Sequence, residues 1–196
     1  MSSENNRIRN DRKNYTGLVL AGGRGRRMGG QDKGLIDHDG QPLVSYSLQA
    51  LQPHCQQIYI NCNRNQEAYA AFGFPLISDP DDSFPGPLRA LAALLPDLPE
   101  SNLLILPCDT PDVGPEHMQT LIDVSLNYPG HWVYLRADGR DHPLHALLPQ
   151  SVRPELLKFI HQSGEQRLMR AIDALPHVAV ELTESLMLNL NRAKSK

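Results

Sequence analysis

The chain has few cysteines, no long apolar run and little net charge, and each absence excludes a class of protein. Its three cysteines, Cys55, Cys62 and Cys108, form no C-x-x-C pair, which favours reduced, buried thiols over a disulfide framework or a zinc site. No segment approaches the ~18 apolar residues that a membrane-spanning helix needs. A formal net charge of −3 argues against general nucleic-acid binding, which usually requires a basic balance. We therefore expect a cytoplasmic protein that binds neither membranes nor nucleic acids.

Apolar residues are nevertheless sufficient for a proper core. With 196 residues, of which 40% are hydrophobic, the chain is most simply one domain, and we place it at residues 16–191. Residues 1–15 are polar and lack the apolar stretch of a secretory signal, so we expect a disordered extension there. Residues 192–196 are expected to form a short tail, and the protein is expected to be a monomer.

Short apolar runs alternate with amphipathic segments along the chain. The runs predict strands at residues 16–20, 57–61, 75–78, 103–106, 132–135, 144–148 and 178–182. The amphipathic segments predict helices at residues 42–51, 66–72, 88–95, 115–126, 152–160 and 165–174. This alternation indicates an α/β fold, a single-domain, three-layer, doubly wound and mostly parallel sheet of Rossmann-like type. A short ribbon is expected around Asp39-Gly40, and residues 140–143 are expected to form a polar loop between two strands.

Residues 20–34 (LAGGRGRRMGGQDKG) follow the first predicted strand and combine glycine with arginine and lysine. Glycines let backbone N–H groups approach a ligand closely, while guanidinium and ammonium groups match phosphate oxygens. The segment matches neither the P-loop pattern nor the dinucleotide pattern G-x-G-x-x-G. A flexible basic surface loop is the alternative, but the joint enrichment favours a polyphosphate site. Arg27 and Lys33 are the candidate cations for the α- and β-phosphates and for stabilising a departing pyrophosphate.

Polar residues follow three further predicted strands, and each has a simpler explanation as a turn or helix-capping residue. Asn61 ends the second strand, Asp79 follows the third, and Asp109 follows the fourth. Because ligands bind at the carboxyl ends of parallel strands, their shared position favours one site. Asp109 is the candidate Mg²⁺ ligand, and Asp79 the second candidate for the metal or the nucleotide. The sequence shows no convincing covalent nucleophile, and phosphoryl transfer needs none.

The loop resembles the nucleotidyltransferase signature L-A-G-G-x-x-x-R-M-G followed by a lysine. From residue 16 to about residue 191, the chain is similar to the MobA-type molybdenum cofactor guanylyltransferases. The resemblance implies a Rossmann-like nucleotidyltransferase that transfers GMP from GTP to the terminal phosphate of molybdopterin and releases pyrophosphate. It implies that Arg27, Lys33 and Asp109 are catalytic, with Mg²⁺ on Asp109 of the Cys108-Asp109-Thr110-Pro111 motif. The implied nucleotide-binding residues are Leu20, Ala21, Gly22, Gly23, Lys33, Asn61, Asp79 and Asp109.

Three further motifs are implied by the resemblance to contact molybdopterin. They are P-G-P before a predicted helix, R-D-H-P between two predicted strands, and N-x-N near the end of the chain. Without the family, P-G-P is equally a stiff helix lead-in and an Asp-His pair is more often a turn. The implied second-substrate residues are Gly86, Arg140, Asp141, His142, Asn189 and Asn191.

Two departures from the family pattern concern this second substrate. Ala90 stands where relatives usually have glycine, which adds a methyl group where the backbone approach can matter. The motif T-P-E/D-E-L that usually follows N-x-N is replaced by Arg192-Ala193-Lys194-Ser195-Lys196. Neither departure touches the residues expected to bind GTP and Mg²⁺.

Other functions stay open at this point. A cytidylyltransferase of the same cofactor shares nearly the whole pattern, and nucleotidyltransferases of sugar phosphates or polyols are more distant. A non-catalytic adaptor that delivers molybdopterin is the alternative from a different class, but it would not need Arg27, Lys33 and Asp109. Molybdenum insertion proteins and apo-molybdoenzymes are the expected protein partners of either kind of molecule.

Overall fold

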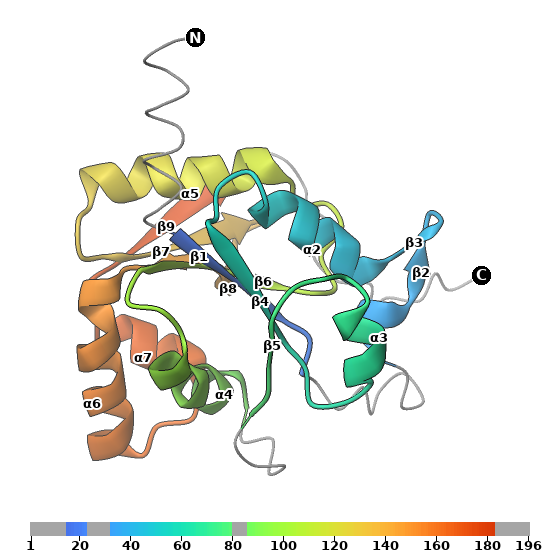
Figure 1. The fold of residues 1–196 in the computed structure, drawn as a ribbon. Coiled ribbons are helices and arrows are strands. Elements are labelled where there is room, and N and C mark those ends of the chain that lie inside the picture. Colours follow the sequence, from blue (N-terminus) through green and yellow to red (C-terminus); the bar gives the residue numbers. More distant parts are fainter. Residues whose placement is uncertain (1–14, 23–31, 80–85, 183–196) are drawn as a thin grey trace, which may run out of the picture.

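The computed structural model describes residues 15–22, 32–79 and 86–182. Their main feature is a seven-stranded sheet with the strand order β5-β4-β1-β6-β8-β7-β9 (Figure 1). All strand pairs of this sheet are parallel except those that β8 makes with β6 and β7. The strands are β1 (Tyr15–Leu20), β4 (Gln57–Asn61), β5 (Leu76–Ile77), β6 (Asn102–Pro107), β7 (Trp132–Ala137), β8 (Arg140–Leu148) and β9 (His177–Leu182). The predicted mostly parallel α/β fold is therefore confirmed.

Helices cover both faces of the sheet (Figure 1). One face carries α2 (Leu43–Leu51) and α5 (Pro115–Asn127), and the other carries α4 (Pro87–Leu94), α6 (Arg153–Ser163) and α7 (Leu168–Asp173). The short helix α3 (Gln66–Ala70) lies near β5 and near the small ribbon formed by β2 (Asp37–His38) and β3 (Gln41–Pro42). Within the described residues, no helix combines the length and apolar character needed to cross a bilayer.

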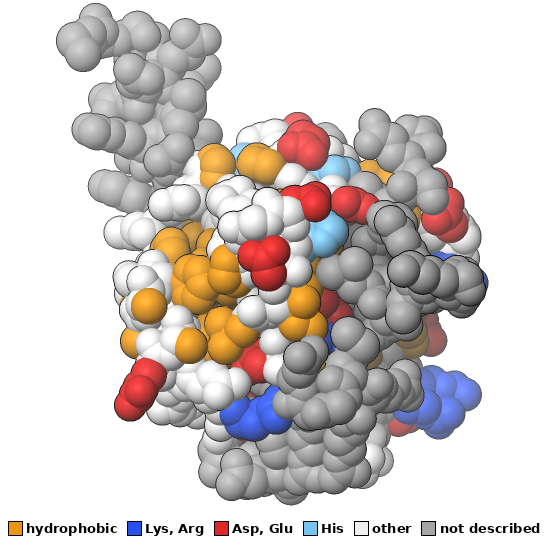
Figure 2. Space-filling model, turned by 90° about the vertical axis from the view of Figure 1, so that its right-hand side faces the viewer, with side chains coloured by type: hydrophobic (Ala, Val, Ile, Leu, Met, Phe, Trp, Pro, Cys, Tyr) orange, Lys and Arg blue, Asp and Glu red, His pale blue; other side chains and the backbone are white. Residues whose placement is uncertain are grey.

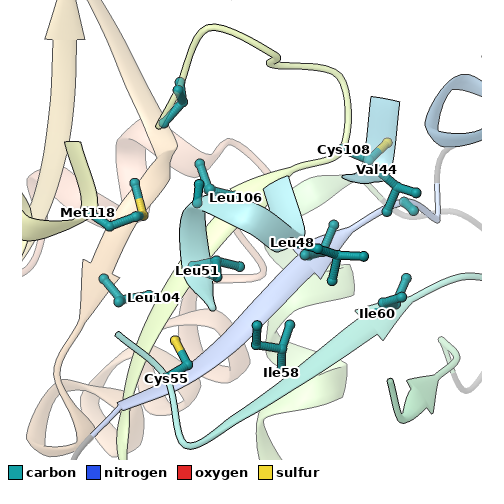
Figure 3. Close-up of a cluster of buried hydrophobic side chains, with 14 of the residues drawn as sticks. Val44, Leu48, Leu51, Cys55, Ile58, Ile60, Leu104, Leu106, Cys108 and Met118 are labelled. Atoms are coloured by element: carbon teal, nitrogen blue, oxygen red, sulfur yellow. The ribbon is translucent and has the colours of Figure 1, made fainter. Parts of the chain in front are cut away.

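Each face of the sheet has its own hydrophobic core. Along β6, Leu104 and Leu106 pack in the core beneath α2 and α5, whereas Leu103 and Ile105 pack in the core beneath α4, α6 and α7. Figure 3 shows the first core, in which leucines of α2 and β6 meet Met118 of α5. Burying one such side chain contributes roughly 1.5–3 kcal/mol. Because both faces of β6 are buried, the side chains that it directs into either core must be apolar, which explains the continuous apolar run in its sequence.

The sheet order places a switch point between β1 and β6. From β1 the chain crosses to β4 on one side, and from β5 it returns to β6 on the other side of β1. In doubly wound folds, ligands bind at such a switch point, outside the carboxyl ends of the strands. The loop after β1 begins at Ala21, and the turn after β6 begins at Cys108.

One local prediction was wrong. The residues Arg140, Asp141, His142 and Pro143, expected in a loop, form the first part of β8. The chain reverses at Asp138-Gly139, where both residues have positive φ angles of 51° and 68°, and Ala137 pairs with Arg140. An Asp-Gly pair with positive φ at both positions is the typical two-residue hairpin turn, and its strands continue directly on either side. The same geometry at Asp39-Gly40 confirms the predicted ribbon.

Candidate nucleotide site

The four parallel strands β5, β4, β1 and β6 end on the same side of the sheet. We call the last residue of each of these strands, together with the residues that follow it, the carboxyl edge. The backbone there continues the sheet beyond the strands: Ala21 N–H donates to Asn61 O at 2.8 Å, and Cys108 N–H donates to Leu20 O at 3.1 Å. These bonds fix the first residues after β1 against both neighbouring strands. Figure 2 looks onto the side of the molecule that carries α3 and the β2–β3 ribbon, and carboxylate side chains are exposed on it.

Gly22 lies directly against the end of β4. A Cβ atom at this position would lie 2.7 Å from Asn61 Oδ1 and 3.2 Å from Asn63 Nδ2. Both are side chains held by other hydrogen bonds, so neither can move away cheaply. Glycine is therefore required here by close packing, and its bare backbone lies next to two amide side chains.

A network of two asparagines and one aspartate joins β4 to β5. Asn61 Nδ2 donates to Asp79 Oδ1 at 3.0 Å and to Ile77 O at 3.3 Å. Asn63 Nδ2 donates to Asp79 Oδ2 at 2.7 Å, and its Oδ1 accepts from the Asp79 N–H at 2.8 Å. Both carboxylate oxygens of Asp79 thus have a fixed donor, which holds this charge in one orientation.

The sequence analysis missed Asn63. Asn61 and Asn63 are two residues apart at the end of a strand, and residues at that spacing point to the same face. The sequence feature that indicates both site residues is therefore the Asn61-Cys62-Asn63 segment at the end of β4, rather than Asn61 alone.

The second ionic feature of the carboxyl edge joins the loop after β1 to the turn after β6. Lys33 Nζ lies 2.9 Å from Asp109 Oδ2, and the two side chains are 28% and 16% exposed. The turn that carries Asp109 is itself held, because the Pro107 carbonyl accepts hydrogen bonds from Ser47 Oγ at 2.8 Å and from Thr110 Oγ1 at 3.1 Å. Lys33 and Asp109, predicted separately from the sequence, are thus brought together across the switch point.

The carboxyl edge offers oxygen ligands to a metal ion. Its carboxylates are Asp79 and Asp109, and the described residues contain no group of three or more His, Cys, Asp or Glu that could hold a metal by themselves. Magnesium is typically bound by one or two carboxylates together with water and substrate phosphates. The donor set therefore fits a hard divalent cation that binds together with a phosphate ligand.

Two buried thiols, those of Cys62 and Cys108, lie at the carboxyl edge, and a third, that of Cys55, lies at the amino end of β4. Cys55, Cys62 and Cys108 are free and buried, as the sequence predicts. Burial raises the pKa of Cys62 to about 11 and that of Cys108 still further. Because the thiolate is the reactive form, these side chains stay protonated and inert at neutral pH.

The predicted second-substrate residues of the R-D-H-P motif lie on the β7–β8 hairpin. Asp141 Oδ1 accepts a hydrogen bond from Arg136 Nε at 2.6 Å. The ring of His142 packs edge-to-face against that of His145, with 5.5 Å between the centroids. Burial lowers the pKa of His142, against the opposing effect of Asp141. These two contacts join residues of β7 and β8 and lie within the hairpin.

The hairpin also contains an irregularity beside His142. Leu135 pairs with His142 and Tyr134 with Ala146, so residues 143–145 have no partners on β7. His145, in this bulge, is 5% exposed, and neither of its ring nitrogens has a hydrogen-bond partner. Burial lowers its pKa to about 3.

The remaining predicted residues divide into two groups. Gly86 caps α4 with a φ angle of 93°, a backbone conformation that glycine adopts freely, and Pro87 starts the helix as expected. Five predicted features lie outside the described residues: Gly23, Arg27, the N-x-N motif with Asn189 and Asn191, residues 1–14 of the expected extension, and the tail at residues 192–196. Tyr15, which was expected to end the extension, is instead the first residue of β1.

Comparisons with known proteins agree with this geometry. The family model of the MobA-like NTP transferase domain matches residues 17–178. A molybdenum cofactor guanylyltransferase of Pseudomonas paraeruginosa is 37% identical over 176 residues, which cover 89% of this chain and 88% of that protein. A protein of the same name from Haemophilus influenzae is 36% identical over 167 residues, which cover 85% and 86%.

Solved structures share the fold at lower sequence identity. Molybdopterin-guanine dinucleotide biosynthesis protein A from Archaeoglobus fulgidus has a TM-score of 0.66 at 21% identity, over 85% of this chain and 83% of that one. A Mycobacterium tuberculosis protein solved in complex with manganese has a TM-score of 0.60 at 20% identity, over 90% and 94%. By the extent of the family match and the identity to the curated relatives, the chain belongs to the family of proteins with a MobA-like NTP transferase domain.

Proposed function

We propose that the protein is a molybdenum cofactor guanylyltransferase, which transfers GMP from GTP to the terminal phosphate of molybdopterin. The observation that carries the proposal is the Lys33–Asp109 pair at the switch point, beside the Asn61–Asp79 network. A cation and a carboxylate at this place suit a nucleoside triphosphate and its metal ion. Relatives that are named molybdenum cofactor guanylyltransferase at 36–37% identity support the choice of GTP and molybdopterin.

The nucleoside is assigned to the part of the carboxyl edge formed by β1, β4 and β5. Leu20, Ala21 and Gly22 lie there at the end of β1, and Gly23 continues the same loop in the sequence. Asn61 and Asp79 present an amide and a carboxylate, which complement the donors and acceptors on the edge of guanine. Because Asn61 and Asn63 already hold Asp79, these groups need no reorganisation when the base binds.

The phosphates are assigned to the part between β1 and β6. A phosphate oxygen of molybdopterin attacks the α-phosphorus of GTP, the bond to the β-phosphate oxygen breaks, and pyrophosphate leaves with the electron pair. Lys33, with Arg27 from the same loop, stabilises the charge that develops on the transferring and leaving phosphates. Asp109 would hold Mg²⁺, which would neutralise the triphosphate charge when bound.

Molybdopterin is assigned to the side of the β7–β8 hairpin. The candidates on the hairpin are Arg140, Asp141 and His142. The other candidates are Gly86, which caps α4, and Asn189 and Asn191 near the end of the chain. The lowered pKa of His142 favours a neutral imidazole at pH 7, which acts as a hydrogen-bonding group rather than a cation. The exposed Arg140 is the candidate partner of the terminal phosphate.

We propose further that the protein is a cytoplasmic monomer, and its free, buried cysteines support this location. Its proposed protein partners are molybdenum insertion proteins and apo-molybdoenzymes.

The proposal is tested by calorimetry of GTP, CTP, ATP and UTP binding with Mg²⁺, followed by pyrophosphate release after addition of molybdopterin. Selective GTP binding with molybdopterin-dependent pyrophosphate release is the expected result. Selectivity for CTP would instead indicate a cytidylyltransferase. Molybdopterin binding without pyrophosphate release from any triphosphate would identify an adaptor, and no triphosphate binding at all would overturn the assignment of the carboxyl edge.

A further inference from the structure

The side chain of Tyr69 is fully buried on α3 and lies beneath the end of the loop that follows β1. Its hydroxyl donates a hydrogen bond to Asp32 Oδ1 at 2.5 Å. Burial and this hydrogen bond both raise the pKa of Tyr69, so the phenol keeps its proton and remains a donor. Asp32 is the residue immediately before Lys33 in the sequence.

Asp32 is held from a second point on the same helix. Asn65, which precedes α3, donates from Nδ2 to Asp32 Oδ2 at 3.0 Å, and its carbonyl accepts the N–H of Tyr69 at 3.1 Å. The two donors of the carboxylate are therefore tied to each other through the first turn of α3. Hydrogen bonds to a charged group are stronger than those between neutral groups, so this contact restrains Asp32 firmly.

The same hydroxyl also limits the residue on the other side of Lys33. A Cβ atom on Gly34 would collide with the Tyr69 hydroxyl and would lie 3.3 Å from Cys108 Sγ. Gly34 is thus packed between Tyr69 and the residue that precedes Asp109. Lys33 stands between two neighbours that both contact Tyr69, and its Nζ lies 2.9 Å from Asp109 Oδ2.

We propose that the Tyr69 hydroxyl is a positioning group that fixes Lys33 at the phosphate site by holding Asp32 and Gly34. This assignment rests on the function proposed above, because it takes Lys33 as the group that stabilises the phosphates. Tyr69 itself is buried and touches no substrate. It acts through the backbone of the three residues Asp32, Lys33 and Gly34.

The test compares Tyr69→Phe with Tyr46→Phe as a matched control. The hydroxyl of Tyr46 is likewise a hydrogen-bond donor, but its acceptor is the backbone carbonyl of His38, at 2.8 Å, and not Asp32. Tyr69→Phe is expected to lower kcat about tenfold and to leave the KM for molybdopterin unchanged. Tyr46→Phe is expected to keep wild-type kcat. Equal kcat values for Tyr69→Phe and wild type would overturn the proposal.

A double-mutant cycle separates positioning from a general structural effect. In a Lys33→Ala background, Tyr69→Phe is expected to change kcat less than twofold, because the group that it positions is gone. A further tenfold loss in that background would show that Tyr69 acts independently of Lys33, which would contradict the proposal. If Tyr69→Phe does not fold, Asn65→Gly removes the other Asp32 donor at a position whose φ of 51° glycine accepts. Asn65→Gly is then expected to lower kcat by less than tenfold in the wild-type background and to change it less than twofold in the Lys33→Ala background.

A readout independent of catalysis keeps this inference distinct from the proposed function. Trace acetylation followed by mass spectrometry measures how exposed the Lys33 amine is in the unliganded protein. We expect Tyr69→Phe to raise the acetylation rate of Lys33 about threefold relative to Lys158, while Tyr46→Phe leaves it unchanged. Unchanged acetylation would refute the positioning role even if the wild-type enzyme proves active. Raised acetylation in a protein without transferase activity would refute only the proposed function.

Discussion

The carboxyl edge and the β7–β8 hairpin hold their polar side chains in different ways. On the carboxyl edge the partners come from different elements: Asp79 is bound by Asn61 and Asn63 from the end of β4, and Lys33 is paired with Asp109 across the switch point. In the hairpin, Asp141 is bound by its cross-strand neighbour Arg136, and the interactions are local. The first region is therefore ordered by the fold, and the second by a single turn.

We infer from this difference, on the basis of the proposed function, that the two regions have different chemical tasks. A site that stabilises charge during phosphoryl transfer must hold its dipoles and charges in place before the reaction. A site that only binds a second substrate can tolerate local adjustment. Substitutions on the carboxyl edge should therefore reduce kcat, whereas substitutions in the hairpin should mainly raise the KM for molybdopterin.

The largest effect is expected for Lys33→Ala. Removing a preorganised group that stabilises transition-state charge typically costs about 10²- to 10³-fold in kcat. Lys33 is 28% exposed, so its loss leaves the fold intact. Steady-state pyrophosphate release measures the effect, and urea unfolding checks the stability. Near-normal release would mean that Lys33 is not catalytic and that the carboxyl edge is not the reacting region.

Asp109→Asn tests the metal ligand of the same edge. The substitution keeps the size of the side chain but removes the charge that pairs with Lys33. We expect the Mg²⁺ concentration for half-maximal turnover to rise about 10- to 100-fold, as for the loss of groups that set metal affinity. Asp123→Asn, on the exposed side of α5, is the matched control and should titrate like the wild type. An unchanged metal titration of Asp109→Asn would contradict ligation by Asp109.

His145→Leu tests how much the buried imidazole of His145 lowers the free energy of unfolding at acidic pH. Its pKa is lowered to about 3 in the folded protein from 6.5, so between these values the unfolded state binds a proton that the folded state does not. His145 therefore does not reduce the free energy of unfolding above pH 6.5, and it reduces it progressively as the pH falls toward 3. At pH 5 the loss amounts to about 2 kcal/mol. Urea unfolding at pH 7 and pH 5 should show that His145→Leu loses about 2 kcal/mol less than the wild type, and equal losses would refute this assignment.

The sequence predicted the carboxyl edge well because its signals are tied to strand ends. Asn61, Asp79 and Asp109 each follow an apolar run, and in a parallel sheet such positions meet. Lys33 and Asp109 are 76 residues apart, and the sequence predicted each of them as a site residue but not their contact. The alternation of apolar and amphipathic segments likewise predicted nearly every strand and helix of the described chain.

What the sequence analysis missed depends on contacts rather than on patterns. Tyr69 resembles any core aromatic on a short helix, and only its 2.5 Å contact with Asp32 separates it from one. His145 lies in an apolar stretch and could not be distinguished from a satisfied core histidine, since the absence of partners is a property of the folded state. Asp138-Gly139 is a recognisable hairpin turn, but the strand at residues 140–143 is not evident from the sequence, because its polar residues and Pro143 are typical of loops.

The smallest effect expected on turnover is that of His142→Ala, and it tests the comparison most directly. His142 lies in the hairpin with its ring against His145, and none of its described contacts reaches the carboxyl edge. We expect the KM for molybdopterin to rise about tenfold, the loss of roughly one hydrogen bond, while kcat and GTP affinity stay within twofold of the wild type. Calorimetry of GTP and a molybdopterin titration of pyrophosphate release measure the two quantities separately. His131→Ala, at a partly exposed histidine before β7, is the matched control and should change neither. A loss of GTP affinity in His142→Ala would show that the hairpin and the carboxyl edge form a single site, and the division of tasks between them would be wrong.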